Sequence, residues 1–244
     1  MTYAAVNGIE LYYEAYGSGR PLVLLHGGLM TIDLNFAPLL EPLAANRQVI
    51  AIELQGHGHT ADTDRPMTIE ALADDVVALL DHLGIADADI FGFSLGGLVA
   101  YAVALSAPAR VGKLIVASAD AHRPPGRESA PLDDDRMPTA ADFQSMRTAY
   151  EAVAPDPGHF DEFAARTSSM VHVFAGWTDE LRSLQAPTLL TFGDRDFSPL
   201  SDVLELLELL PNAQLAVLPG TTHMGIIRRH DLVLALSTQF LDAS

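Results

Sequence analysis

Three polar residues, far apart in a chain of 244 residues, are of the types that nucleophilic acyl transfer requires. Ser94 lies in the segment Gly-Phe-Ser-Leu-Gly at 92–96, which matches the pattern G-x-S-x-G. A serine hydroxyl is a weak nucleophile at neutral pH and needs an adjacent base, which a carboxylate in turn must orient. We choose His223 as the base, from nine histidines, and Asp196 as the carboxylate.

The surroundings of Ser94 favour a sharp turn that presents its hydroxyl. An apolar, strand-like segment precedes the serine, and an apolar helical segment follows it. Such a turn strains the backbone and is tolerated only where neighbouring positions have no side chain, a demand that Gly92, Gly96 and Gly97 meet. The serine then stands at a helix N-terminus, where backbone N–H groups can stabilise developing negative charge.

The predicted base and acid both follow buried strands, and the choice of acid has alternatives. His223 lies in a predicted loop between the last strand and the last helix. Asp196 comes shortly after the strand that ends at Phe192, so both side chains are expected at the carboxyl edge of the sheet. Asp194, in the same turn, and Asp120, after an earlier strand, are the alternatives to Asp196.

Strand and helix patterns alternate along most of the chain. Residues 3–16 alternate around Asn7-Gly8, which predicts a hairpin. The period of apolar residues predicts a helix over 68–83, with Thr68 as N-cap and Gly84 as C-cap. The other expected strands are 21–25, 49–52, 89–93, 114–117, 188–192 and 214–218, and the other expected helices are 36–45, 95–105, 200–210 and 225–241. This alternation indicates an α/β fold with one doubly wound, mostly parallel sheet.

One segment departs from the alternation. Residues 121–182 are rich in Pro, Asp, Arg, Met and aromatic residues and contain no buried-strand pattern. We therefore predict a helical lid (cap) over 121–182, inserted into an α/β core made of 1–120 and 183–244.

With these features the chain resembles the α/β-hydrolase superfamily, in the branch of lidded esterases, lactonases, cofactor-free haloperoxidase/perhydrolases and carbon–carbon bond hydrolases. Five ordered motifs carry the resemblance: His26-Gly27-Gly28, residues 56–60 (Gly-His-Gly-His-Thr), the turn at Ser94, Gly193 to Asp196, and His223. The resemblance implies a sheet of about eight strands with the lid after the sixth. It also implies an oxyanion hole made by the backbone N–H groups of Gly28 and Leu95, and no cofactor.

The segment at 56–60 departs from the family's frequent Gly-x-Gly-Arg-Ser, and we interpret it as a turn rather than a metal site. His26 is interpreted as a structural side chain that hydrogen-bonds these loops.

Composition limits the remaining possibilities. The chain has no cysteine, which excludes disulfides, thiolate metal sites and a cysteine nucleophile. Its formal net charge of −18 argues against binding to nucleic acid or anionic membranes. No apolar run is long enough for a membrane helix and no secretory signal is visible, so we predict a soluble, cytoplasmic protein. The oligomeric state stays open, a homo-oligomer included.

The prediction is a cofactor-free serine hydrolase that cleaves a carboxylic ester or related acyl bond through a covalent acyl-enzyme. Lactone opening, perhydrolysis and carbon–carbon cleavage use the same three residues and remain alternatives, as does a small-ligand receptor on the same fold. Apolar side chains beside the catalytic groups suggest an uncharged or apolar small-molecule substrate. The residues predicted to line its pocket are Leu29, Phe93, Trp177 and Met224.

Overall fold

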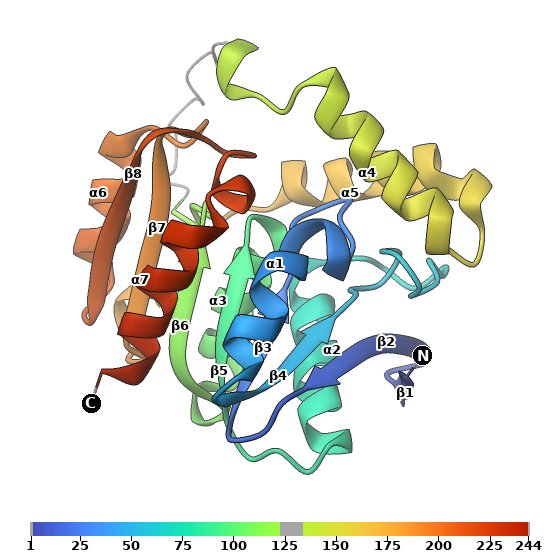
Figure 1. Cartoon of the computed structure of the whole chain (residues 1–244), viewed down its shortest axis with the longest axis horizontal. Coiled ribbons are helices and arrows are strands. Elements are labelled where there is room, and N and C mark those ends of the chain that lie inside the picture. Colours follow the sequence, from blue (N-terminus) through green and yellow to red (C-terminus); the bar gives the residue numbers. More distant parts are fainter. Residues whose placement is uncertain (1, 123–133, 244) are drawn as a thin grey trace.

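The computed structural model describes residues 2–122 and 134–243, which form one eight-stranded sheet with helices on both faces (Figure 1). The strand order is β1-β2-β4-β3-β5-β6-β7-β8. The strands are β1 (Thr2–Val6), β2 (Ile9–Tyr16), β3 (Arg20–Leu25), β4 (Arg47–Ile52), β5 (Ala88–Phe93), β6 (Val111–Ala117), β7 (Thr188–Arg195) and β8 (Ala213–Thr222). Only β2 pairs in an antiparallel manner, with β1 and with β4, and the pairs from β4 to β8 are parallel. The predicted mostly parallel sheet is confirmed.

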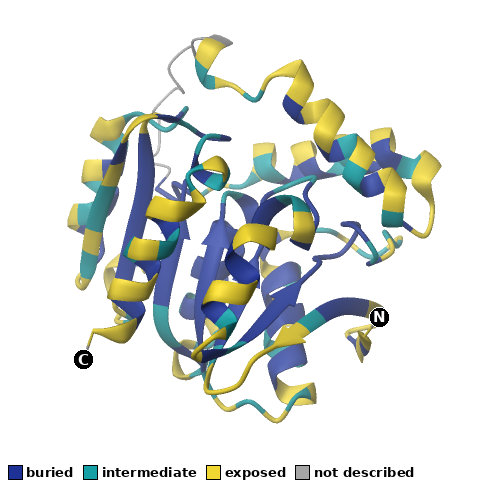
Figure 2. Ribbon diagram, in the orientation of Figure 1, coloured by how far each residue is buried: buried dark blue, intermediate teal, exposed yellow. Residues whose placement is uncertain are grey.

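The helices cover both faces of the sheet, so the core consists of two apolar layers with the sheet between them. They are α1 (Ile32–Ala44), α2 (Ile69–His82), α3 (Leu95–Ser106), α4 (Ala140–Val153), α5 (Phe160–Val173), α6 (Leu200–Leu209) and α7 (His230–Asp242). Buried side chains of α1 and α7 pack on one face of the sheet, and those of α2, α3 and α6 pack on the other. Figure 2 shows the consequence: the central strands are buried along their length, and the helices expose only their outer sides.

Local signals in the sequence explain several element boundaries. Asn7 and Gly8 both have positive φ, 46° and 84°, as a tight hairpin turn between β1 and β2 requires. The Thr68 hydroxyl accepts a hydrogen bond from the amide of Ala71, 3.1 Å away, which confirms the predicted cap of α2. Gly84 has φ of 67°, the left-handed conformation typical just after a helix.

Three predicted boundaries are wrong, each for a local reason. The first helix begins at Ile32 rather than residue 36, because the Thr31 hydroxyl caps it by accepting from the amide of Leu34. Strand β8 runs on to Thr222, well past the predicted end at 218, along its parallel partner β7. The last α-helix begins at His230 instead of 225, since a short 3₁₀ turn at Ile226–Arg228 precedes it.

The chain between β6 and β7 supplies the helices α4 and α5, which lie together at one end of the sheet (Figure 1). Residues 123–133 of the predicted lid lie outside the described residues. Strands β6 and β7 pair directly with each other, so the sheet is continuous across this insertion. Among the described residues, no helix has both the length and the apolar composition needed to cross a bilayer.

Candidate active site

Ser94 stands on a strained turn between β5 and α3. Its backbone angles, φ 52° and ψ −116°, lie outside the regions that most side chains favour. A Cβ atom on Gly92 would lie 2.2 Å from the carbonyl oxygen of Gly96, and one on Gly96 would lie 2.1 Å from that of Leu25. The predicted need for glycine around this turn is confirmed. The turn places the serine directly before the first residue of α3.

The imidazole of His223 connects Ser94 to a carboxylate. Its Nε2 atom lies 2.9 Å from Ser94 Oγ, and its Nδ1 atom lies 3.1 Å from Asp196 Oδ1. An ionised carboxylate only accepts hydrogen bonds, so Nδ1 carries the proton and donates to Asp196. The lone pair of Nε2 then accepts from the serine hydroxyl. This is the orientation in which Nε2 can remove the hydroxyl proton.

Asp196 is fully buried, and three groups hold its carboxylate. Besides His223, the hydroxyl of Ser118 donates to Oδ2 over 2.5 Å, and the amide of Ser198 donates to Oδ1 over 3.3 Å. Burial by itself would raise the pKa of this carboxyl group. The hydrogen bond and charge of His223, with the bonds from Ser118 and Ser198, outweigh burial and leave the pKa below its usual value. The group is therefore ionised at neutral pH.

The two alternative acids have other partners. Asp194 accepts a hydrogen bond from the amide of Thr221, 3.1 Å away, and so braces the loop that carries His223. Hydrogen bonds from the amides of Gly220 and Thr221 also lower the pKa of Asp194. Asp120 accepts from the amide of His122 over 2.8 Å. Of the three carboxylates considered from sequence, Asp196 is the one that the structure records within hydrogen-bond distance of His223.

Two residues that the sequence did not single out hold this arrangement. Ser118 comes directly after β6 and reaches Asp196 from the neighbouring strand end. The ring of Phe197 stacks on the imidazole of His223, with ring centres 4.0 Å apart. A polar residue immediately after a buried strand was a usable signal for Ser118. Nothing in the sequence indicates the stacking of Phe197.

The predicted pocket residues fall into two groups. The ring of Phe93 lies 5.1 Å from that of His223, and Met224 is buried in the same apolar cluster as Phe93. Leu29 packs against that cluster and has a positive φ of 62°. Trp177 packs instead in the cluster on the opposite face of the sheet, with its ring edge-on to Phe174 at 4.6 Å.

The two amides predicted to form the oxyanion hole belong to neighbouring segments. Leu95 is the first residue of α3, and Gly28 lies in the turn after β3. A Cβ atom on Gly28 would lie 3.8 Å from Cβ of Leu95 and 3.5 Å from Cγ2 of Thr167 in α5. Gly28 therefore lies close to both the helix that follows the serine and a helix of the predicted lid.

Two further histidines are buried near this edge but have no carboxylate partner in the described contacts. The Nδ1 atom of His26 lies 2.8 Å from the carbonyl oxygen of Gly27, and its Nε2 accepts from the amide of Leu54 over 3.2 Å. Its predicted structural role is confirmed, and burial lowers its pKa to about 4. The Nδ1 atom of His57 lies 3.0 Å from the carbonyl oxygen of Gln55.

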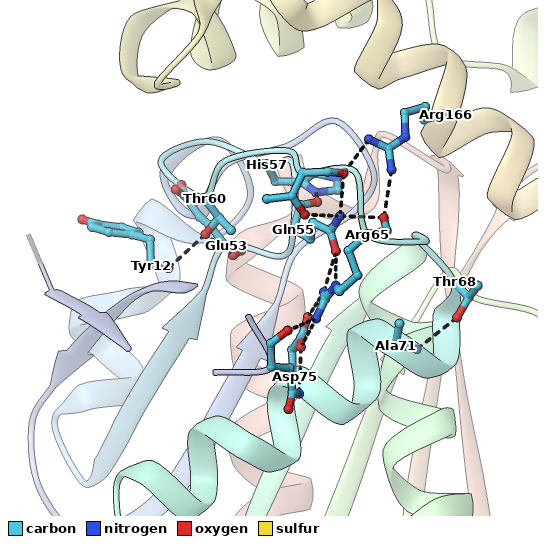
Figure 3. Close-up of polar contacts among 12 residues, drawn as sticks. Tyr12, Glu53, Gln55, His57, Thr60, Arg65, Thr68, Ala71, Asp75 and Arg166 are labelled. Atoms are coloured by element: carbon cyan, nitrogen blue, oxygen red, sulfur yellow. Dashed lines mark hydrogen bonds and ion pairs between the residues drawn. The ribbon is translucent and has the colours of Figure 1, made fainter. Parts of the chain in front are cut away.

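The loop after β4 is held by polar contacts (Figure 3). Arg65 donates to the side-chain oxygen of Gln55 over 2.8 Å and forms an ion pair with Asp75 at 2.5 Å. His59 lies 2.8 Å from the buried carboxylate of Glu53. Within residues 2–122 and 134–243, no group of three or more His, Cys, Asp or Glu side chains is arranged to hold a metal ion.

Comparison with known proteins places this geometry in context. A family model described as alpha/beta hydrolase fold matches residues 20–162. The chain is 28% identical to a non-heme haloperoxidase of Rhodococcus erythropolis, with 98% of each chain covered. It is 29% identical to a 2-hydroxy-6-oxononadienedioate/2-hydroxy-6-oxononatrienedioate hydrolase of Pseudomonas putida, over 88% of this chain and 85% of that protein. The enol-lactonase of Burkholderia xenovorans has a similar fold, with a TM-score of 0.81, 23% identity, and coverage of 99% of this chain and 100% of that one.

Proposed function

Because this chain belongs to the α/β-hydrolase fold family, we propose that it is a serine hydrolase that cleaves an uncharged carboxylic ester or lactone through a covalent acyl-enzyme. The observation that carries the proposal is the hydrogen-bonded series Ser94–His223–Asp196, with distances of 2.9 and 3.1 Å. Both distances are within hydrogen-bond range, so His223 Nε2 can take the serine proton directly while the carboxylate of Asp196 orients the imidazole.

In the first half of the reaction, Ser94 Oγ attacks the carbonyl carbon while His223 Nε2 takes the hydroxyl proton. The imidazolium that forms is stabilised by the ionised carboxylate of Asp196. The amides of Gly28 and Leu95 are the proposed donors to the negative oxygen of the tetrahedral intermediate. The intermediate collapses as His223 passes its proton to the leaving alcohol oxygen, and the acyl group stays on Ser94.

The second half repeats these steps with water as the nucleophile. His223 removes a proton from water, and the resulting oxygen attacks the acyl carbon. The new tetrahedral intermediate expels Ser94 Oγ, which regains its proton from His223. The products are the free acid and the original enzyme, so no redox partner or cofactor enters the balance.

We propose that the insertion at 121–182 is a lid over this site. Its helix α5 contacts the core beside the proposed oxyanion hole, because Thr167 lies against Gly28. The proposed pocket is apolar, with Phe93 and Met224 next to His223. The net charge of −18 disfavours anionic substrates at long range, which also supports an uncharged ester.

A substrate panel tests the proposal. Wild-type protein is given p-nitrophenyl acetate and butyrate, γ- and δ-lactones, and a β-diketone, with Ser94→Ala as the matched control. We expect a burst of p-nitrophenol equal to the concentration of active sites, followed by a steady rate, and neither in the variant. Binding of these compounds without turnover by wild type would instead favour a ligand receptor on this fold. Faster turnover of the diketone than of any ester would favour carbon–carbon cleavage.

A further inference from the structure

The imidazole of His223 is covered on one face by the aromatic ring of Phe197. The ring centres lie 4.0 Å apart and the two planes make an angle of 26°, so the rings are stacked. His223 is buried and Phe197 is half-buried. The face of a phenyl ring carries negative potential, which attracts a cation that lies within about 6 Å of the ring centre. A protonated imidazole at this position is therefore stabilised more than a neutral one.

Short-range hydrogen bonds fix the segment that carries Phe197. The amide of Asp196 donates to the carbonyl oxygen of Gly193 over 3.2 Å, and the amide of Ser198 donates to Asp196 Oδ1 over 3.3 Å. An aspartate that accepts from the amide two residues further on forms a compact turn. The same Oδ1 atom accepts from Nδ1 of His223. The turn therefore holds the ring of Phe197 beside the imidazole that its own carboxylate orients.

A second histidine of this protein shows the same combination of contacts. The Nδ1 atom of His59 lies 2.8 Å from the buried carboxylate of Glu53, and the ring of Tyr12 stacks on the imidazole with ring centres 4.1 Å apart and an angle of 21°. His57, whose Nδ1 faces a carbonyl oxygen, instead meets the ring of Phe163 at an angle of 85°. In these three cases, parallel stacking accompanies a carboxylate partner, which is the partner that a charged imidazole needs.

We propose that Phe197 is a positioning residue whose ring holds the imidazole of His223 in place and stabilises its protonated form. This inference rests on the function proposed above, in which His223 becomes positively charged in both halves of the reaction. The proton moves from Ser94 Oγ, or from water, to Nε2 and then to the departing oxygen, and Phe197 exchanges none. Because the ring attracts the charged imidazole more strongly than the neutral one, Phe197 favours the transition state over the bound substrate and acts mainly on kcat.

Two substitutions separate the aromatic face of Phe197 from its bulk. Phe197→Leu keeps an apolar side chain and removes the ring, whereas Phe197→Tyr keeps the ring. With p-nitrophenyl acetate, we expect Phe197→Leu to lower kcat about 10-fold with KM within about 2-fold of wild type, the order of effect of one cation–π contact in a desolvated site. Phe197→Tyr should stay within about 2-fold of wild type. The control Tyr3→Leu removes an exposed ring from β1 and should leave kcat unchanged.

Fluorinated phenylalanines at position 197 weaken the attraction with little change in shape. Fluorine withdraws electron density from the ring, so the negative potential over its face falls from mono- to di- to trifluorophenylalanine. We expect kcat to fall at each step, towards the rate of Phe197→Leu. The inference is overturned if Phe197→Leu keeps the wild-type kcat, if Phe197→Tyr is as slow as Phe197→Leu, or if all the fluorinated proteins match wild type. Loss of the proposed function itself is a separate result, since it appears as equal rates for wild type and Ser94→Ala.

Discussion

Two buried histidines of this protein, His223 and His57, have similar surroundings but different partners. Both are almost completely inaccessible to solvent, and both have Nδ1 within hydrogen-bond distance of an oxygen. For His223 that oxygen belongs to the carboxylate of Asp196, and Nε2 points to the hydroxyl of Ser94. For His57 the oxygen is the backbone carbonyl of Gln55, and Nε2 has no recorded partner in the described chain.

The difference decides which imidazole can accept a proton. Burial disfavours the charged form of His57, and the ring of His26, 4.7 Å away, adds to the effect, so the pKa of His57 lies well below its usual value. A carbonyl dipole does not compensate for that cost, whereas an ionised carboxylate stabilises an adjacent imidazolium. A buried imidazole without a carboxylate partner stays neutral and has a structural role. A buried imidazole with a carboxylate partner can act as a base.

The same substitution at both positions distinguishes the two histidines most clearly. His223→Gln should lower kcat/KM for p-nitrophenyl acetate by about 10⁴- to 10⁶-fold, because the base is lost. His57→Gln should stay within about 10-fold of wild type, since His57 takes no part in proton transfer. Steady-state kinetics measures both, with far-UV circular dichroism as the check on folding. Comparable losses at the two positions would remove the distinction between them.

The next largest effect concerns the carboxylate behind His223. Asp196→Asn should lower kcat by about 10²- to 10⁴-fold, because an amide neither fixes the tautomer nor stabilises the imidazolium. The matched controls are Asp194→Asn and Asp120→Asn, which change the other two carboxylates and should each cost less than about 10-fold. A larger loss at residue 194 or 120 than at 196 would mean that the acid has been assigned to the wrong residue.

A smaller effect is expected at Ser118, which donates to the second oxygen of Asp196. Hydrogen bonds to charged groups contribute about 1.5–3 kcal/mol, so Ser118→Ala should lower kcat by about 10- to 100-fold while leaving the nucleophile and base in place. The pKa of Asp196 should also rise, since one of the groups that lower it is removed. Steady-state kinetics at neutral pH measures the loss of kcat, and a kcat identical to that of wild type would exclude this role.

The smallest expected effect is on stability rather than catalysis. As the pH falls below about 6.5, His26 and His57 gain protons in the unfolded chain but stay neutral in the native protein, where the pKa of His26 is about 4. The unfolded state then binds more protons, so stability falls by about 1.4 kcal/mol per pH unit for each ring. His57→Gln removes one ring and should flatten the decline between pH 6.5 and 5 by that amount. Urea unfolding at several pH values measures it, and parallel curves for the two proteins would contradict it.

Most of the fold and the candidate trio could be predicted because both depend on short-range patterns. Apolar runs ending in glycine or polar residues mark the strand ends, and parallel strands bring those ends to one edge, which is why Ser94, Asp196 and His223 could be grouped from sequence. The caps at Thr68 and Gly84 are similarly local. Which of Asp196, Asp194 and Asp120 lies next to His223 depends on the path of each loop, which the sequence pattern does not specify.

The features that escaped prediction depend on contacts between distant parts of the chain. The early start of α1 is an exception, because its cap, Thr31, is three residues from the amide that it accepts from and was a usable local signal. The bond from Ser118 to Asp196 spans 78 residues, and the contact of Thr167 with Gly28 joins a lid helix to a core turn. No periodic pattern carries this information, because it arises only when the elements pack.

Activation of Ser94 by His223 can be measured as the mass of the intact protein after reaction with a fluorophosphonate, which modifies only an activated serine. We expect one adduct per chain on wild-type protein, located by peptide mapping to Ser94, and none on Ser94→Ala or His223→Gln. Modification of His57→Gln should proceed as fast as that of wild type. A wild-type protein that stays unmodified, or an adduct formed equally fast without His223, would show that this imidazole does not activate this hydroxyl.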